Sequence, residues 1–588
     1  MRIRTTLTGG AMLALGLTTP ATAASTATAA DLVLRHGSVE VGKAGRRAQA
    51  VAVRKGVIVY VGTNAGVKKY IGKKTKVVNL RGRTLMPGIQ DGHVHLTPKL
   101  AVCDLNYQYL TVPETQALIQ KCLDDDKAKG KTDKDWLTVL NWDLPGMKPA
   151  GTVPDKAILD ALNTGRPIYV FSDDGHNALV NSRALELAGI TKATKDPEGG
   201  VIVRDANGEP TGYLKEDTAI DLVRTKIPPA PLAERVEGLR TTLAHVTANG
   251  LTAYQPQMLT ESDLQAWKYL ADRRELPGRV VGSLGLDANA AYADLPGTLK
   301  RIKALKKKYE GPNFKINAVG EIFVDGVIEY PNQTALLLKP YLVKNSKGKW
   351  VPGKTRGPVR ITQARLNKVV AALDKARWQI HAHAIGDGAV REALNAYAYA
   401  RDKNGSHGQR HLIAHAQLVD PADYKRFKRL NVTASIATQW AEKDPYTMDA
   451  LKPFIGVKRW KRLYPWHSLL KADARLANGS DFPVDALNPM RQLEAAVTRT
   501  AESTEGNKNY KGPLNAAERI TLSQAIQIHT FNTAYLLGLE KKTGSIEVGR
   551  RFDVIVLSGN LRKVKITKIG DLTVKATLVG GELKAGKL

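Results

Sequence analysis

Histidines and carboxylates stand in this sequence where short apolar runs end. His93 and His95 close one such run, with a single valine between them. Alternate side chains of an extended strand point to the same face, so the two imidazoles would lie side by side. Neutral imidazole is the commonest metal ligand among side chains, and such a pair could bind one ion with little rearrangement. The pair alone is weak evidence, because most closely spaced histidines bind no metal.

Three further side chains have the same chemistry and a similar placement. His383 and His415 each close an apolar, β-rich run, and Asp481 follows a strand-like segment next to a proline. In a β/α barrel, the catalytic groups come from the C-terminal ends of different strands. These side chains are therefore candidates to meet at one end of such a barrel.

The elements that must position these groups alternate along the chain. β-rich runs are interleaved with amphipathic helical stretches at 232–249, 361–375 and 389–401, which predicts repeated β-α units around a parallel sheet or barrel. Short β-rich runs with glycine turns occur near both termini, at 31–62 and 544–581, and we expect them to complete one sheet domain together. Residues 104–224 are less regular and rich in Asp, Gly and Pro, which suggests an insertion after the first barrel strand.

The first 30 residues have the pattern of a secretory signal. Arg2 and Arg4 precede a short apolar run at 10–17, and small residues at 21–23 suit a signal peptidase. We therefore expect a secreted protein of the extracellular space or cell envelope. The run is too short to anchor the chain in a bilayer, and no other long apolar segment predicts a transmembrane span. An oxidising compartment would allow Cys103 and Cys122 to pair, which we state as a hypothesis.

The chain is long and strongly basic. Its 588 residues suffice for a large barrel and an accessory domain, and 87 basic against 56 acidic residues give a net charge of +31. Such a charge suits a polyanion partner. However, the basic residues are spread along the chain and no basic run alternates with aromatics. We interpret the charge mainly as solvation, with no specific nucleic-acid partner.

The chain resembles the amidohydrolase superfamily and, within it, the amidohydrolase-3 (YtcJ-like) group. The matching motifs follow the family's order and cover 87–95, 174–190, 210–216, 325–329, 381–387, 415–418 and 479–484. The resemblance implies a TIM-type (β/α)8 barrel at 86–534, interrupted by the insertion at about 104–224, and a composite β-sandwich built from 31–85 and 535–588. It also implies a metal-dependent hydrolase acting on carbon-nitrogen bonds other than peptide bonds.

The resemblance assigns the metal ligands residue by residue. His93 and His95 would be the ligands on strand 1, His383 on strand 5, His415 on strand 6 and Asp481 on strand 8. One position departs from the family, which usually has a lysine that is carbamylated to bridge two metals. This chain has Glu321 there. A glutamate also presents two oxygens, so we expect Glu321 to be a direct bridging ligand.

These residue types suit hydrolysis of an amide. A bound divalent ion lowers the pKa of its water from 15.7 to about 7 and so supplies hydroxide at neutral pH. Four imidazoles and one or two carboxylates suit one or two zinc ions, although manganese and iron fit the same ligand types. Asp481 is the natural general base. His176 could bind the substrate or an oxyanion, and Glu216 and Asp325 could contact the substrate or orient a ligand histidine. A buried core histidine and turn or cap carboxylates are the structural alternatives for these three.

The leading hypothesis is a secreted hydrolase of a small molecule with an amide, formamide or cyclic amide bond. A catalytically silent envelope protein that binds a ligand on the same barrel is a second hypothesis, although the filled ligand positions argue against it. An esterase or a deaminase is a third, because the metal chemistry does not select the leaving group. The sequence leaves the substrate and the oligomeric state open.

Overall fold

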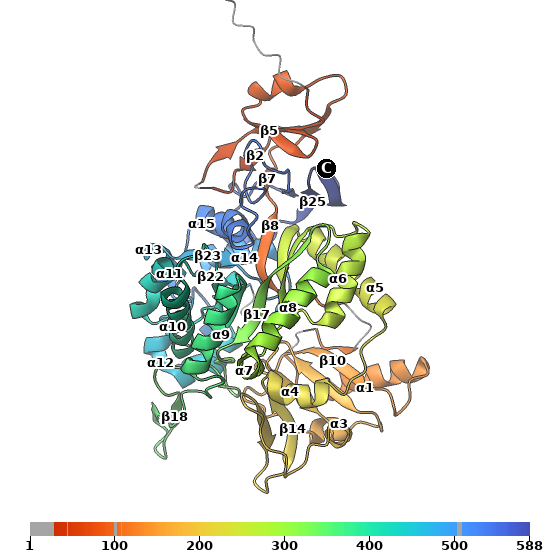
Figure 1. Cartoon of the computed structure of the whole chain (residues 1–588), viewed down its shortest axis with the longest axis vertical. Helices are drawn as coiled ribbons and strands as arrows, with labels where there is room; N and C mark the ends of the chain where they lie inside the picture. Colours follow the sequence, from red (N-terminus) through yellow and green to blue (C-terminus); the bar gives the residue numbers. More distant parts are fainter. Residues whose placement is uncertain (1–28, 44, 99–102, 107–108, 503–507) are drawn as a thin grey trace, which may run out of the picture.

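A computed structural model describes residues 29–43, 45–98, 103–106, 109–502 and 508–588. The molecule has three parts along its long axis: a β-sandwich at one end, a barrel in the middle and an inserted α/β unit at the other end (Figure 1). The predicted signal peptide lies outside the described residues, apart from its last two positions. No helix in the described part of the chain is long and apolar enough to cross a membrane.

The barrel is an eight-stranded sheet in which every hydrogen-bonded pair of strands is parallel. Side-chain and backbone hydrogen bonds between its first and last strands nearly close the ring, for example from Asn478 Nδ2 to the carbonyl of Gln90 at 3.1 Å. The TIM-type fold expected from the sequence is thus confirmed. Its strands are β8 (Ile89–Val94), β15 (Leu251–Pro256), β16 (Arg279–Leu284), β17 (Phe314–Phe323), β20 (Gln379–Ala384), β21 (Leu412–His415), β22 (Thr433–Ile436) and β23 (Arg475–Asn478).

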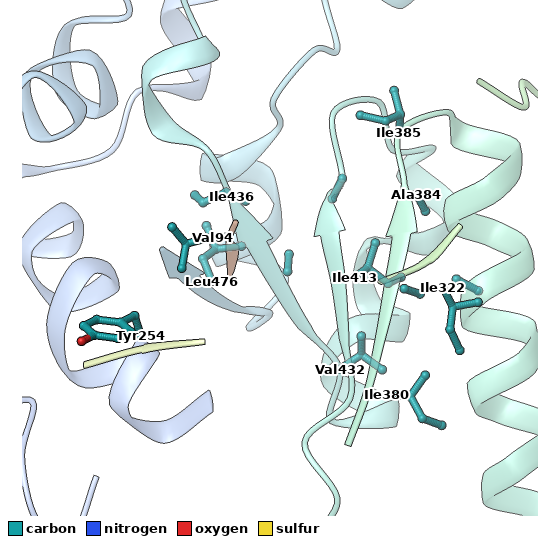
Figure 2. Close-up of a cluster of buried hydrophobic side chains, with 14 of the residues drawn as sticks. Val94, Tyr254, Ile322, Ile380, Ala384, Ile385, Ile413, Val432, Ile436 and Leu476 are labelled. Atoms are coloured by element: carbon teal, nitrogen blue, oxygen red, sulfur yellow. The ribbon is translucent and has the colours of Figure 1, made fainter. Parts of the chain in front are cut away.

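Helices cover the outside of the barrel and bury its branched side chains. Figure 2 shows Ile322, Ile380 and Ile413, which come from three neighbouring strands and pack in one fully buried cluster. The predicted helical stretches occur as α5 (Leu232–Ala248), α9 (Gln363–Lys375) and α10 (Asp387–Asn404). The other helices of this part are α6 (Glu261–Asp272), α7 (Ala288–Ala293), α8 (Leu295–Tyr309), α11 (Tyr424–Leu430), α12 (Lys452–Trp460), α13 (Trp466–Lys471), α14 (Pro489–Thr498), α15 (Leu522–Gln527) and α16 (Thr533–Leu536).

Segments from both ends of the described chain build the sandwich. One sheet has the order β5-β4-β1-β6 and the other β26-β25-β24-β7-β2-β3, so β24 and β25 pair in one sheet with β7 and β2. Apolar residues of both sheets, such as Val51 and Val554, form one core. The strands are β1 (Leu32–Arg35), β2 (Ser38–Glu40), β3 (Arg47–Ala48), β4 (Ala50–Arg54), β5 (Val57–Gly62), β6 (Lys76–Asn79), β7 (Thr84–Pro87), β24 (Val554–Leu557), β25 (Val574–Val579) and β26 (Glu582–Gly586).

The inserted unit follows β8 and is more ordered than its composition suggests. Its six strands form one mixed sheet in the order β13-β14-β12-β11-β10-β9. Cys103 and Cys122 are disulfide-bonded and join β9 to α1. Its elements are β9 (Cys103–Asp104), α1 (Val112–Ala128), β10 (Leu137–Trp142), α2 (Ala157–Asp160), β11 (Ile168–Ser172), β12 (Asn177–Val180), α3 (Ser182–Ala188), β13 (Val201–Arg204), β14 (Pro210–Lys215) and α4 (Asp217–Arg224).

A long connection after β17 ties the inserted unit to the barrel. It carries a hairpin, β18 (Leu342–Lys344) and β19 (Trp350–Pro352), that the sequence pattern did not indicate. Lys215 Nζ of the insertion donates to the carbonyl of Pro331 in this connection at 3.0 Å, and Asn332 Nδ2 donates to Asp174 Oδ2 at 3.0 Å. The insertion therefore sits at the end of the barrel toward which the strands run, opposite the sandwich (Figure 1).

Candidate metal centre

The six predicted metal ligands converge at that end of the barrel. His93 lies in β8, Glu321 in β17, His383 in β20 and His415 at the end of β21. Asp481 follows β23, and His95 follows β8. All are buried except His95, whose side chain is 24% exposed. Period-two alternation along each strand directs these side chains into the barrel, as the spacing predicts.

The two oxygens of Glu321 face different pairs of imidazoles. Oε1 lies 2.9 Å from His383 Nδ1 and 3.1 Å from His415 Nε2. Oε2 lies 3.6 Å from His93 Nε2 and 3.7 Å from His95 Nε2. This arrangement is the one that a carboxylate shared between two neighbouring sites requires.

Asp481 completes the group on one side only. Its Oδ1 lies 2.8 Å from His93 Nε2 and 3.1 Å from His95 Nε2, whereas its Oδ2 is 3.8 Å from His415 Nδ1. The centre is therefore unequal, because two imidazoles and a second carboxylate gather near Oε2 of Glu321 but only two imidazoles gather near Oε1.

The chemistry of this donor set fits a divalent metal. Potential ligand atoms of His93, His95 and Asp481 lie within 4.8 Å of one another, as do those of His93, Glu321 and His415. Burial would raise the pKa of both carboxyl groups, but the neighbouring imidazoles, His93 foremost, hold the pKa of Glu321 and Asp481 well below the usual range. Imidazole nitrogen and carboxylate oxygen are standard ligands of zinc. Two ionised carboxylates among imidazoles would attract a divalent cation, which would take the place of the proton on His93.

The pKa values of two candidate ligand histidines shift in opposite directions. Burial lowers the pKa of His93, but Glu321 and Asp481 outweigh it and raise that pKa to about 9. Burial and the neighbouring His415 lower the pKa of His383 to about 4, so this ring is neutral and keeps a lone pair for coordination. The centre thus concentrates negative charge near His93.

The backbone at the barrel mouth is unusual at two ligand positions. His415 has φ 71° and Asp481 has φ 60°, in the left-handed region that non-glycine residues seldom adopt. The backbone N–H of Asp481 donates to the carbonyl of His93 at 3.0 Å, and that of His95 donates to the carbonyl of Phe482 at 2.7 Å. These bonds hold the ends of the first and last barrel strands in register. Residues in such conformations often cluster at functional sites.

His381 and Asp325 support the ligands from behind. His381 is fully buried, and its Nε2 lies 2.6 Å from Nδ1 of His93. Asp325 is also fully buried, and its oxygens accept the backbone N–H groups of Leu336, Ile385 and Gly386 at 2.9–3.0 Å. These bonds fix the loop that follows His383, and Asp325 Oδ1 also lies 3.8 Å from Nε2 of His383.

The other two predicted substrate residues form a buried network beside the centre. Nδ1 of His176 lies 2.8 Å from Oε2 of Glu216, which also accepts a hydrogen bond from Arg360. Burial opposes charge on both groups, but Arg360 and then His176 lower the pKa of Glu216 to about 2, and Glu216 raises the pKa of His176 to about 9. The His176 ring packs 4.8 Å from that of His383 and 5.3 Å from that of Phe323, measured between centroids. His176 therefore packs against one of the candidate ligands, and Glu216 orients it through a hydrogen bond.

Some residues of the site carried no signal in the sequence. Arg360 lies in the connection after β17, with its guanidinium 4.9 Å from the Phe323 ring. Trp440 stacks on His415 at 5.5 Å between ring centroids, so it lines the centre. Neither residue belongs to a motif or to a periodic run, and only the folded chain brings them to the ligands.

Comparison with known proteins agrees with this geometry. The model of the amidohydrolase family matches residues 76–584. The chain is 29% identical over 552 residues to putative amidohydrolase YtcJ of Bacillus subtilis, covering 92% of this chain and 96% of that protein. It is 25% identical over 555 residues to N-substituted formamide deformylase of Arthrobacter pascens, covering 91% of this chain and 95% of that protein.

A solved structure shares the fold. An uncharacterized metal-dependent hydrolase from Pyrococcus horikoshii superposes with a TM-score of 0.67 at 22% identity, covering 91% of this chain and 99% of the other. The family match spans most of the chain, and its five expected ligand positions, together with Glu321, surround one centre. The chain therefore belongs to the amidohydrolase family and is a hydrolase of carbon-nitrogen bonds.

Proposed function

We propose that this protein is a secreted enzyme that hydrolyses a non-peptide carbon-nitrogen bond of a small amide, formamide or cyclic amide. His93, His95, Glu321, His383, His415 and Asp481 would hold one or two divalent ions, for which zinc suits the donor set. The observation that carries the proposal is the position of Glu321, whose oxygens each face a separate pair of imidazoles.

The chain's own residues would carry the proton transfers. When bound, a divalent ion lowers the pKa of a water molecule and polarises a carbonyl group. Asp481 is placed to act as general base, because its Oδ1 is near His93 and His95 whereas its Oδ2 lies 3.8 Å from Nδ1 of His415. Oδ2 would accept the proton of the attacking water and return it to the departing nitrogen.

His176 would bind the substrate carbonyl. Glu216 holds its Nδ1, which leaves Nε2 without a hydrogen-bond partner among the described residues. The ring packs against His383, beside the centre. A donor fixed in this way stabilises charge that develops on the carbonyl oxygen during attack. Glu216 would orient His176, so it contributes to substrate binding indirectly.

Secretion is supported by two features. The first is the signal-like pattern of the first 30 residues. The second is the Cys103–Cys122 disulfide, since such bonds persist in oxidising compartments. Sequencing the N-terminus of protein recovered outside the producing cells tests the proposal. A chain that keeps residues 1–23 and stays inside the cell would contradict it.

Metal content and turnover test the enzymatic proposal together. Protein purified without added metal should contain a stoichiometric transition metal and release amine from members of a panel of N-substituted formamides, amides and lactams. Loss of metal on chelation should stop the release, and zinc should restore it. Protein that binds no metal after exposure to zinc or manganese, and hydrolyses nothing in the panel, would favour the silent ligand-binding protein instead.

A further inference from the structure

A pocket of about 570 Å³ opens beside Glu321, at the ends of β15, β16 and β17. Its volume falls in the range of small-molecule sites, which is roughly 300–1,000 Å³. Helix α4 of the insertion lines its opposite side, and Figure 1 shows α4 next to α7 at this end of the barrel. The pocket thus reaches the metal centre at one end, between the barrel and the inserted unit.

Apolar side chains form much of the pocket wall. They come from the segments that follow the three barrel strands and from the connection that carries Arg360. The main ones are Met258, Leu259, Leu284, Leu286, Phe323 and Ile361. Leu259, Leu284 and Ile361 are almost fully buried, whereas Met258 and Phe323 are partly accessible. An apolar group that entered the pocket would therefore contact accessible apolar surface close to Glu321.

Most charged residues of the same wall already have partners; among the described residues Arg301 is the exception, and it is exposed to solvent on α8. Arg360 pairs with Glu216, and Arg224 pairs with Asp221 at 2.6 Å and with Asp217 at 3.4 Å. Toward the rim, Glu198 pairs with Arg365 at 2.7 Å and Glu261 with Lys308 at 2.9 Å, while Asp287 caps α7 by accepting the Ala290 N–H at 2.6 Å. Away from Arg301, a charged ligand would have to replace one of these partners, and a buried charge without a partner is costly.

We infer that this pocket binds an uncharged, largely apolar substituent of the substrate while the scissile bond lies at Glu321 and Asp481. This inference rests on the proposed function and adds the class of substrate to it. The preferred substrates are neutral amides or formamides with an apolar chain or ring of several carbons. Short, anionic and cationic analogues bind poorly.

A homologous series of substrates tests the inference. Burying one CH₂ group changes affinity about fourfold, so kcat/KM of the metal-loaded enzyme should rise about 10³-fold from N-methylformamide to N-hexylformamide. Analogues of the hexyl compound with a terminal carboxylate or ammonium group should be at least ~100-fold poorer. Hydrolysis with equal kcat/KM along the series, or equal use of a charged analogue, would overturn the inference and leave the proposed function standing.

A substitution that fills the pocket tests whether the preference for long substituents arises there. Ala288 lines the pocket at the start of α7 and is 6% exposed. Ala288→Trp should reduce the hexyl-to-methyl ratio from about 10³ to tenfold or less. Ala517→Trp, at an exposed alanine outside the pocket, is the control and should keep the ratio. An unchanged ratio in a folded Ala288→Trp protein would refute the placement.

Binding of 1-hexanol decides the question independently of turnover. Calorimetric titration should show saturable binding to the wild-type holoenzyme and to Ala517→Trp but none to Ala288→Trp. If the holoenzyme binds 1-hexanol in this pattern yet hydrolyses no member of the series, the proposed function fails and the pocket remains. If 1-hexanol does not bind to the wild type, the inference about the pocket fails.

Discussion

Two buried carboxylates at opposite ends of the barrel have very different partners. At the sandwich end, Asp553 accepts two hydrogen bonds from the guanidinium of Arg279, at 2.7 and 3.0 Å. At the insertion end, Glu321 is surrounded by imidazoles. A guanidinium always carries its charge and neutralises the aspartate permanently. Imidazoles offer lone pairs instead, so the charge of Glu321 remains for a cation. A buried carboxylate paired with a guanidinium is thus structural, whereas one surrounded by imidazoles can bind a metal.

Removing the charge of Glu321 should have the largest effect. Glu321→Gln keeps the shape of the side chain but removes the anion that both halves of the centre share. We expect the protein to lose at least one equivalent of metal and hydrolysis to fall by at least ~10³-fold, because the ions that activate water are lost. Metal analysis by mass spectrometry and amine release measure both effects. Full metal content with normal turnover would remove Glu321 from the centre.

Asp481→Asn should lower kcat by about 10²–10⁴-fold, the usual contribution of a general base. The metal bound near His383 and His415 should remain, since Asp481 lies on the other side of Glu321. Asp473→Asn makes the same chemical change at an exposed position and should leave kcat unaltered. Near-wild-type turnover by the Asp481 variant would exclude it as the base.

His176→Asn should lower kcat by about 10²-fold, because one donor to the carbonyl oxygen is lost. Metal content should not change, since His176 contacts His383 only by ring packing. Steady-state kinetics on one formamide, together with metal analysis, separates these effects. A change in KM alone would place His176 in ground-state binding and not in stabilisation of the reaction.

At the sandwich end, Arg279→Met should reduce stability and not chemistry. It leaves Asp553 buried without its guanidinium, which should lower the free energy of unfolding by about 3 kcal/mol. Urea unfolding measures the loss, and kcat should stay within about twofold of wild type. Arg274→Met, at an exposed arginine between α6 and β16, should change neither the free energy of unfolding nor kcat. A large loss of activity in Arg279→Met would mean that the two ends are coupled.

The smallest effect concerns the junction between the insertion and the barrel. Burial lowers the pKa of Lys215 to about 8, against 10.5 for an unperturbed lysine. Between these values the unfolded chain binds more protons than the folded chain, so Lys215 makes stability rise with pH from 8 to 10.5. Urea unfolding at pH 7.5, 9 and 10.5 should show this rise in wild type relative to Lys215→Met. Lys195→Met, at an exposed lysine, should show the same rise of unfolding free energy with pH as the wild type.

The sequence was most informative where chemistry and strand periodicity coincide. His93, His95, His383 and His415 stand at the ends of apolar runs, which made them candidates to meet, and the family resemblance assigned them as ligands. The six-stranded sheet of the insertion was not predicted, because its strands are short and combine parallel with antiparallel pairing.

Side chains on connections were equally hidden from the sequence. Arg360 reaches Glu216 only through the path of a loop. The bonds of Asp325 to backbone N–H groups of Ile385 and Gly386 likewise depend on a fold that its neighbours in sequence do not reveal. Local patterns predict elements, whereas long-range loop paths decide these contacts.

The bonds between Asp481 and His93, and between His95 and Phe482, join segments that are almost 400 residues apart in the chain. A ribosome must therefore synthesise nearly the whole polypeptide before the reactive centre can assemble. Nascent chains and fragments that stop short of Asp481 lack one of the proposed metal ligands and the proposed general base.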